Sequence, residues 1–318
     1  MSDSNLRYDA QAIAKEILAN EICQDMAVFH KKQKRLACAG FISIAIGLGL
    51  LLAHSSPWMI CTGIAGIVIG IGIFSCKRSG KRQFFKAKLI PLLLRAISPS
   101  LKYSPNGGLS KSQVAEFKLF GSFDRCRSED QITGKIGKTA VKISEIYLEQ
   151  RHRDRDGNET CNAVFHGVVF IADFNKHFKC RTAVLPDTAE KIFGKLLGNF
   201  FQQMNFSESG KLVKLENVEF EKQFAVYSTD QLEARYILTP QLMERLLAVQ
   251  AAESGRIRVL FENSNIVIAI PRSDNWLEPP EFGNLDDLEA LTHTAQEIIS
   301  MVKLVEDLDL NTRIWTKQ

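Results

Sequence analysis

One apolar stretch decides the fold of this chain: Leu36 to Cys76, which reads LACAGFISIAIGLGLLLAHSSPWMICTGIAGIVIGIGIFSC. Its 41 residues include no Asp, Glu, Lys or Arg. A helix needs about 20 residues to cross a hydrocarbon core of ~30 Å, so the stretch is long enough for two. The polar turn His54-Ser55-Ser56-Pro57 divides it, and Pro57 suits the first position of a helix because its missing N–H costs nothing there. The sequence predicts a transmembrane helical hairpin over residues 36–76, with spans 36–53 and 57–76.

Two other interpretations of the stretch fit the residues less well. A buried hairpin in a soluble core normally has charged residues on its outer faces, and these two runs have none. A cleaved signal peptide is disfavoured because the apolar run begins only at Leu36, after a segment with several acidic residues.

Seven glycines lie in the hairpin, and Gly66 and Gly70 form a small-xxx-small pair. Such pairs let helix backbones approach closely in lipid. The glycines indicate either packing between the two helices of one hairpin or a contact between hairpins of two chains, which would make a homo-oligomer.

Basic residues flank the hairpin on both sides, whereas the turn has none. Residues 77–100 hold seven Lys or Arg and no acidic residue. The positive-inside rule therefore places both termini in the cytoplasm, and we expect a membrane protein with two spans. We define the basic collar as six cations after the second span: Lys77, Arg78, Lys81, Arg82, Lys86 and Lys88. We expect the collar to contact anionic lipid headgroups.

Whole-chain averages describe a mixture of these parts. The chain of 318 residues is 45% hydrophobic and 24% charged, with a net charge of +4. The positive charge belongs to the collar, while the part after residue 100 is mildly acidic, so nucleic acid is not an expected partner. We expect four regions: an N-terminal cytoplasmic helix (1–35), the hairpin (36–76), a basic juxtamembrane helix and linker (77–108) and a cytoplasmic domain (109–318).

The cytoplasmic domain has the pattern of an α+β fold with a mostly antiparallel sheet and three helices. Strands are expected at residues 140–150, 162–172, 181–185, 211–215, 220–227, 256–262 and 266–270. Helices are expected at 187–204, 239–253 and 285–307, the second with Thr239 as N-cap and Pro240 at its first position. The last helix has apolar residues at heptad spacing for under three heptads, which favours packing on its own domain over a coiled coil.

Several motifs in this domain resemble known sites but lack essential parts. Residues 134–139 look like the end of a phosphate-binding loop, but the earlier glycine is replaced by Ile132, so a hairpin turn is expected. Residues 154–157 resemble a calcium loop without its first and last ligands. The seven cysteines have no Cys-x-x-Cys spacing. Neither a metal site nor a cofactor is therefore expected.

The segment FEKQFAVYSTDQLEARYILTP, Phe220 to Pro240, carries a resemblance to a known family. It is similar to the pattern F-E-x-x-F-x-V-Y-S-x-D-x-x-E-A-R-Y-x-L-T-P of a bacterial membrane-protein family of unknown function, sometimes labelled galanin-like. A second stretch, Phe165–Phe170 with Asp173–Lys176, also resembles that family. The resemblance implies a helical hairpin before the domain and a location in the bacterial inner membrane, and it carries no activity.

The same segment supplies the candidate binding residues, which are Asp230, Glu233, Arg235 and Tyr236. One interpretation is an Arg–carboxylate clamp that stabilises a strand-to-helix junction, and the other is a ligand-binding edge. A nucleophile pair of Cys180 with His166 or His177 is a further alternative.

These features favour a membrane-anchored cytoplasmic binding or scaffold domain, with a protein partner or lipid headgroups as its ligand. One alternative is a membrane-tethered enzyme with an unassigned site, since the sequence assigns no catalytic residues. Another is a secreted effector that inserts into a host membrane.

Overall fold

The computed structural model describes residues 9–53, 56–153, 159–174, 176–186, 211–253, 256–281 and 283–310. The chain divides into two compact units. The first holds residues 1–97 and 277–297, and the second holds residues 98–276 and 298–318. The expected helix at 187–204 and the expected connection at 154–158 lie outside the described residues.

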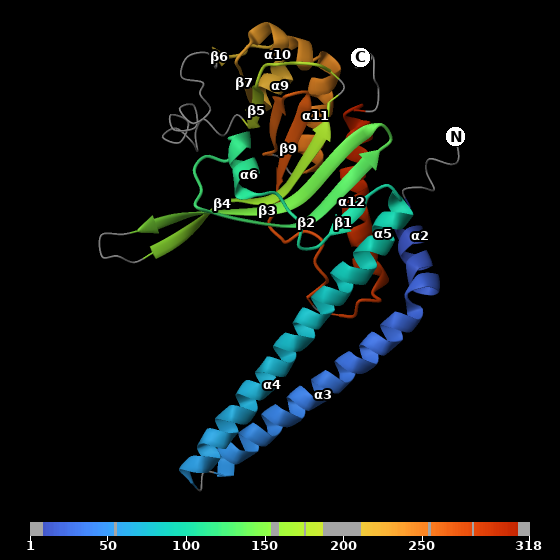
Figure 1. Ribbon diagram of the computed structural model, residues 1–318, viewed down its shortest axis with the longest axis vertical. Helices are drawn as coiled ribbons and strands as arrows, with labels where there is room; N and C mark the ends of the chain where they lie inside the picture. Colours follow the sequence, from blue (N-terminus) through green and yellow to red (C-terminus); the bar gives the residue numbers. More distant parts are fainter. Residues whose placement is uncertain are drawn as a thin grey trace. The chain divides into compact units, whose positions relative to one another are not determined.

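The first unit is built on two long helices, α3 (Cys23–Ala53) and α4 (Pro57–Phe84), which run side by side (Figure 1). Both are long and apolar enough to cross a membrane, by length and composition. Only 11% of the most apolar window of each helix is buried, unlike the core hairpin of a soluble protein. Pro57 occupies the first turn of α4, as expected, and both helices continue beyond the predicted spans.

Shorter helical pieces flank this hairpin in the first unit. Before it lie α2 (Ala10–Glu16), which Asp9 caps, and a π-helical turn (Ile17–Glu21). After α4 come a second π-helical turn (Phe85–Leu89) and α5 (Ile90–Ile97). Pro91, which lacks an N–H for the helical hydrogen-bond ladder, is the second residue of α5 and follows directly after this π-helical turn.

The glycines form the seam between α3 and α4. A Cβ added at Gly47 would lie 2.6 Å from the Gly63 carbonyl oxygen, and one added at Gly63 would lie 2.8 Å from that of Gly47. The Ser43 hydroxyl donates to the Gly66 carbonyl oxygen at 2.8 Å. In contrast, Gly49 and Gly72 face open space. The expected packing within one hairpin is therefore present, because only glycine allows these backbones to approach so closely.

The second unit contains a nine-stranded sheet with the order β1-β2-β3-β4-β9-β8-β5-β7-β6, in which every neighbouring pair is antiparallel. The α+β expectation is thus confirmed. The strands are β1 (Lys102–Ser104), β2 (Arg125–Ile136), β3 (Thr139–Arg153), β4 (Glu159–Asp173), β5 (Thr182–Pro186), β6 (Lys211–Leu212), β7 (Phe224–Ser228), β8 (Arg258–Glu262) and β9 (Asn265–Pro271).

Helices of this unit begin at polar caps. Ser110 and Gln113 form a capping box on α6 (Lys111–Phe117), and Asp230 caps α10 (Gln231–Ile237). Thr239 caps α11 (Pro240–Ala252), as the sequence predicts. The last helix, α12 (Leu288–Asp307), confirms the expected helix at 285–307, and the boundary between the two units falls within it.

Three parts of the sheet differ from the sequence prediction, and the first is β1, which lies in the expected linker at residues 77–108. Residues 218–223, expected as strand, form the helix α9 (Val218–Gln223), because Asn217 caps it and Phe220 stacks on Phe224 one turn later, with ring centroids 4.9 Å apart. Strand β2 was not expected, since its first half is almost entirely polar. The turn between β2 and β3, at Gly137 and Lys138, confirms a hairpin in place of a phosphate-binding loop.

Alternation along β3 and β4 separates a hydrophobic face from a polar one. Ile146 and Leu148 on β3, with Phe165 and Val169 on β4, belong to a buried core cluster that also includes residues of α6. Neighbouring residues along each strand point to the opposite face. Glu145, Tyr147 and His166 therefore lie together on the other side of the sheet.

Candidate functional site

A polar cavity of about 650 Å³ lies on this second face of the sheet. Strands β2, β3 and β4 supply most of its lining, and the segments before β2 and after β9 complete it. The lining residues are Asn106, Cys126, Arg127, Ser128, Glu129, Glu145, Tyr147, His166 and Asn275. A concave site with several converging polar groups is where a small ligand is expected to bind.

Glu145 is the most buried acidic residue of the cavity lining, with 4% of its surface exposed. Its Oε1 atom lies 2.9 Å from His166 Nε2 and accepts a hydrogen bond of 3.0 Å from the Trp276 backbone N–H. Burial raises the pKa of this carboxyl above its usual range, although the hydrogen bonds from His166 and Trp276 act in the opposite direction. The negative charge of Glu129 also raises it.

A β-bulge brings two more carboxylates to the same place. Glu129 on β2 is directly opposite Glu145 on β3, and the register then shifts, so that Ile132 is opposite Ile143. Two residues of β2, Asp130 and Gln131, thus share the space opposite Ser144. Asp130 takes a positive φ of 56°, which lets its side chain turn to the same side as that of Glu129.

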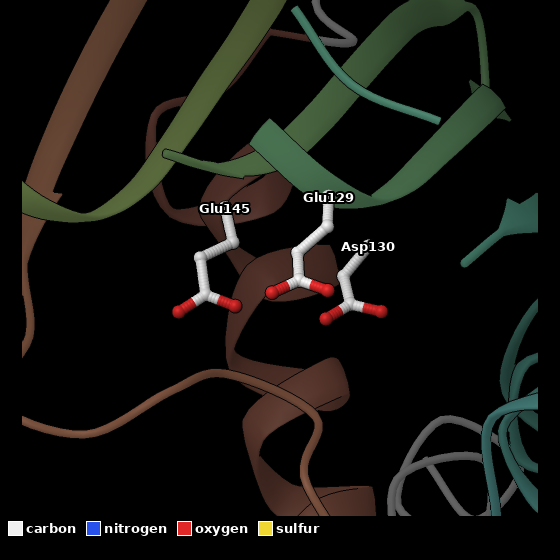
Figure 2. A group of neighbouring side chains, drawn as sticks. All are labelled: Glu129, Asp130 and Glu145. Atoms are coloured by element: carbon white, nitrogen blue, oxygen red, sulfur yellow. The ribbon is translucent and has the colours of Figure 1, made fainter. Parts of the chain in front are cut away.

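We call Glu129, Asp130 and Glu145 the β2–β3 carboxylates. One oxygen atom of each lies within 4.8 Å of one oxygen of each of the others. Figure 2 shows the three side chains in a row, with their carboxylates turned to the same side of the two strands. Carboxylate oxygens are the ligands that hard divalent cations prefer.

The edge of the sheet fixes Asp130 in this position. Asp130 is fully buried, its side chain accepts a hydrogen bond from the Tyr103 hydroxyl on β1, and its backbone N–H donates to the Pro105 carbonyl oxygen at 3.1 Å. The chain between β1 and α6 lies close against β2 here, since a Cβ added at Gly108 would be 2.4 Å from the Ser128 hydroxyl oxygen. The carboxylates therefore belong to a rigid part of the sheet.

An aromatic and basic group lines the other part of the cavity. The Arg127 guanidinium lies 4.8 Å from the centre of the Tyr147 ring and 3.4 Å from the Glu149 carboxylate. Tyr147 in turn makes an edge contact with the His166 ring. The cavity therefore places negative charge near Glu145 and positive charge near Tyr147 on one face.

The residues expected from sequence lie elsewhere and make structural contacts. Asp230 caps α10 by accepting from the Leu232 and Glu233 N–H groups. Glu233 accepts from the N–H groups of Lys179 and Cys180, at 3.1 Å and 2.6 Å. Burial acts to raise the pKa of Glu233, but hydrogen bonds from Cys180 and Lys179 outweigh it, and the pKa lies below its usual range.

Arg235 and Tyr236 complete the candidates from this segment. The Arg235 guanidinium donates to the Lys214 carbonyl oxygen at 3.2 Å, and among the described residues it pairs with neither Asp230 nor Glu233. The Lys176 ammonium lies 4.5 Å from the centre of the Tyr236 ring and donates to the Tyr236 carbonyl oxygen. These contacts join α10 to the segment before β5 and to the residues after β6, in place of the expected Arg–carboxylate clamp.

Cys180 is not paired with either histidine considered in the sequence analysis. Its thiol contacts the Thr182 hydroxyl at 3.3 Å, while His166 contacts Glu145 and His177 contacts Ser264. Burial raises the pKa of the Cys180 thiol to about 11, so the thiol is protonated at neutral pH. A thiolate nucleophile is therefore disfavoured at this position.

The basic collar is engaged within the first unit. The Arg82 guanidinium and the Lys86 ammonium both contact Glu278, at 2.6 Å and 2.7 Å. Other collar cations contact the same segment or α3: Arg78 contacts Glu281, Lys81 contacts the Pro280 and Gly283 carbonyl oxygens, and Lys88 contacts Asp25. The residues after Trp276 thus supply acidic and carbonyl partners to the collar.

A family model matches part of the sheet unit and the last helix. Residues 163–310, less than half of the chain, match the family model described as "Protein of unknown function (DUF3137)". His166 and Trp276 lie inside this range, whereas the β2–β3 carboxylates lie before it. A comparison with curated proteins found no match.

Among solved structures, the crystal structure of the mycobacterial trehalose monomycolate transport factor A, TtfA, is similar. The two chains are 9% identical, and the alignment covers 70% of this chain and 93% of that chain with a TM-score of 0.34. A similarity of this size carries no functional argument.

Proposed function

We propose that this chain is a membrane-anchored binding protein of the bacterial inner membrane. The hairpin of α3 and α4 is the anchor, and the sheet unit binds a ligand through the polar cavity on β2, β3 and β4. We also propose that the chain belongs to the bacterial membrane-protein family that its sequence resembles, and that both of its termini lie in the cytoplasm.

The observation that carries the anchor is the way the hairpin is packed. Glycines of the hairpin pack between the two helices, while many of its large apolar side chains are exposed on the outer faces. Among these exposed residues are Phe41, Ile46, Leu52, Trp58, Val68 and Ile71. Lipid would cover such a surface, and each helix satisfies its own backbone hydrogen bonds, as a membrane span requires.

The contacts of the basic collar bear on the choice of ligand. Five of its six cations already contact carboxylates or carbonyl oxygens within the first unit. Anionic headgroups would have to compete with these partners, which weakens the case for lipid as the main ligand. Some groups that line the cavity on the sheet also have internal partners, but its volume of about 650 Å³ leaves room for a ligand beside them. We therefore propose it as the binding surface for a soluble ligand or a protein partner.

Alkaline carbonate extraction and cysteine labelling test the anchor and its orientation. We expect the protein to remain in the membrane pellet. In a variant that keeps only the exposed Cys161 of the sheet unit and Ser56→Cys at the turn, an impermeant maleimide should label position 56 on intact spheroplasts. Cys161 should react only after permeabilisation.

Two results would contradict the proposal. Release of the protein by carbonate would remove the anchor. Labelling of Cys161 on intact spheroplasts would place the sheet unit outside the cytoplasm, and recovery of the chain from the culture medium would favour a secreted effector.

A further inference from the structure

The β2–β3 carboxylates form an arrangement that an ordinary sheet avoids. Glu129 and Glu145 are directly opposite each other on neighbouring strands, and the bulge adds Asp130 beside them. Like charges in directly opposite positions destabilise a sheet. A cation bound beside the three carboxylates would relieve this repulsion.

A second observation comes from the oxygen atoms of Glu145. The side chain is only 5% exposed, and Oε1 is used by His166 and by the Trp276 N–H. The other oxygen, Oε2, is buried and has no hydrogen-bond partner among the described residues. Buried carboxylate oxygens are rarely left in this state, because desolvation without a new partner is unfavourable.

We propose that the β2–β3 carboxylates bind a hard divalent cation. The proposal rests on the proposed role of the cavity as a binding site, and it names the ligand class. Three carboxylates supply oxygen ligands and more than balance the charge of one divalent ion. The cavity beside them leaves room for the water molecules that complete the coordination of such an ion.

The spread of the oxygens indicates the size of the ion. Two ligands of one ion are separated by at most twice the metal–oxygen distance, which is about 5 Å for Ca²⁺ and about 4 Å for Mg²⁺. The observed spread of up to 4.8 Å suits an ion of the size of Ca²⁺ without movement. Mg²⁺ requires the carboxylates to move together, so we expect weaker binding of Mg²⁺ than of Ca²⁺ or Mn²⁺.

The test uses the full chain in detergent after treatment with EDTA. CaCl₂, MnCl₂ and MgCl₂ are titrated separately by calorimetry, and the melting temperature is measured with and without each ion. We expect one ion per chain and a higher melting temperature when it is bound. Terbium should bind at the same place and give luminescence on excitation of tyrosine, because the Tyr103 hydroxyl contacts Asp130 and Tyr147 lines the cavity.

Matched variants distinguish this site from other acidic positions. Glu129→Gln and Glu145→Gln should each weaken ion binding by about 10-fold or more and remove the terbium signal. Glu159→Gln is the control, since it makes the same change at an exposed position of β4 outside the cavity lining and the three carboxylates. It should bind the ion as the wild type does.

Absence of binding to the wild type would overturn the proposal, as would binding that persists in both Glu129→Gln and Glu145→Gln. Circular dichroism checks that the variants fold, and Glu129→Gln is the safer one because Glu129 is only partly buried. Carbonate extraction of the same variants tests the membrane anchor separately from the cation site. A chain that stays in the membrane but binds no ion contradicts the cation site and leaves the anchor standing.

Discussion

Glu129 on β2 and Glu145 on β3 face each other directly across two antiparallel strands. Glu145 is almost fully buried, and its pKa is raised by burial and by the charge of Glu129. In the absence of a cation, a proton on Glu145 is the other way to relieve the repulsion between the two carboxylates. The pair therefore links the stability of the sheet to pH and to bound ions.

This link predicts how Glu145→Gln changes stability in EDTA. A carboxyl with a raised pKa in the folded state stabilises the protein below its unfolded pKa of about 4.3, and this stabilisation is lost as the pH rises through the folded pKa. Glutamine stays neutral at every pH. The melting temperature of the variant minus that of the wild type should therefore be larger at pH 8 than at pH 4. A difference in melting temperature that was instead larger at pH 4 than at pH 8 would contradict this prediction.

The glycine seam predicts a contrast between two neighbouring positions of α3. Gly47→Ala places a Cβ 2.6 Å from the Gly63 carbonyl oxygen, a backbone atom that cannot move without shifting α4. We expect it to destabilise the hairpin by about 1–3 kcal/mol. Gly49→Ala enters open space and should be neutral or slightly stabilising. Thermal unfolding in detergent, followed by far-UV circular dichroism, measures both, and equal melting temperatures would show that the seam is not tightly packed.

Two acidic residues after Trp276 should differ in their importance for the basic collar. Glu278 contacts both Arg82 and Lys86, and the Lys86 side chain is only 7% exposed. Removing an ion-pair contact of a buried charge is costly, so Glu278→Gln should destabilise the folded protein by about 3 kcal/mol.

Glu281→Gln is the matched control for that change. The side chains of Arg78 and Glu281 are 81% and 67% exposed, and exposed ion pairs contribute about 0–1 kcal/mol. Hydrogen exchange of the amides in residues 277–287 should therefore accelerate strongly in Glu278→Gln and little in Glu281→Gln. The reverse order would show that burial of Lys86 does not determine the strength of the contact.

The Glu233 carboxylate predicts a pH dependence of the opposite sign. Its hydrogen bonds from Lys179 and Cys180 lower its pKa in the folded state, so its contribution is present above the unfolded pKa and is lost as the pH falls. Glu233→Gln should cost about 2 kcal/mol at pH 7, since hydrogen bonds to a charged group contribute about 1.5–3 kcal/mol.

Urea unfolding at pH 7 and at pH 3 measures this difference. The difference in unfolding free energy between wild type and Glu233→Gln should be smaller at pH 3 than at pH 7, because this stabilisation is lost as the pH falls below the unfolded pKa. An equal difference in unfolding free energy at both values of pH would mean that the charge of Glu233 does not contribute to stability.

Some parts of the fold could be predicted because their signals are local. The lack of charge over residues 36–76 indicated the hairpin, and Thr239 with Pro240 indicated the start of α11. Alternation and turn residues indicated β3, β4, β8 and β9. The strand β2 was missed because its stability comes from pairing with β3, whereas its own residues from Arg125 to Gln131 are almost all polar.

The candidate site was missed for a related reason. Asp230, Glu233 and Arg235 stand close together in a distinctive motif, but the structure uses them for caps and for contacts with the backbone. Glu129, Asp130, Glu145 and His166 are scattered over three strands and form no motif. The alternating pattern of β3 indicated that Glu145 and Ile146 lie on opposite faces of the sheet. It did not indicate that Glu129 lies opposite Glu145 on the neighbouring strand.

The sequence by itself determined a hairpin apolar and long enough to span a membrane and a mainly antiparallel α+β unit, since hydrophobic patterning acts through neighbours along the chain. Only the tertiary structure decided which charged residues meet. Strand register and one bulge bring Glu129, Asp130 and Glu145 together, and the segment after Trp276 supplies partners for the basic collar. Both results depend on contacts between residues far apart in sequence, whose pairing no local pattern specifies.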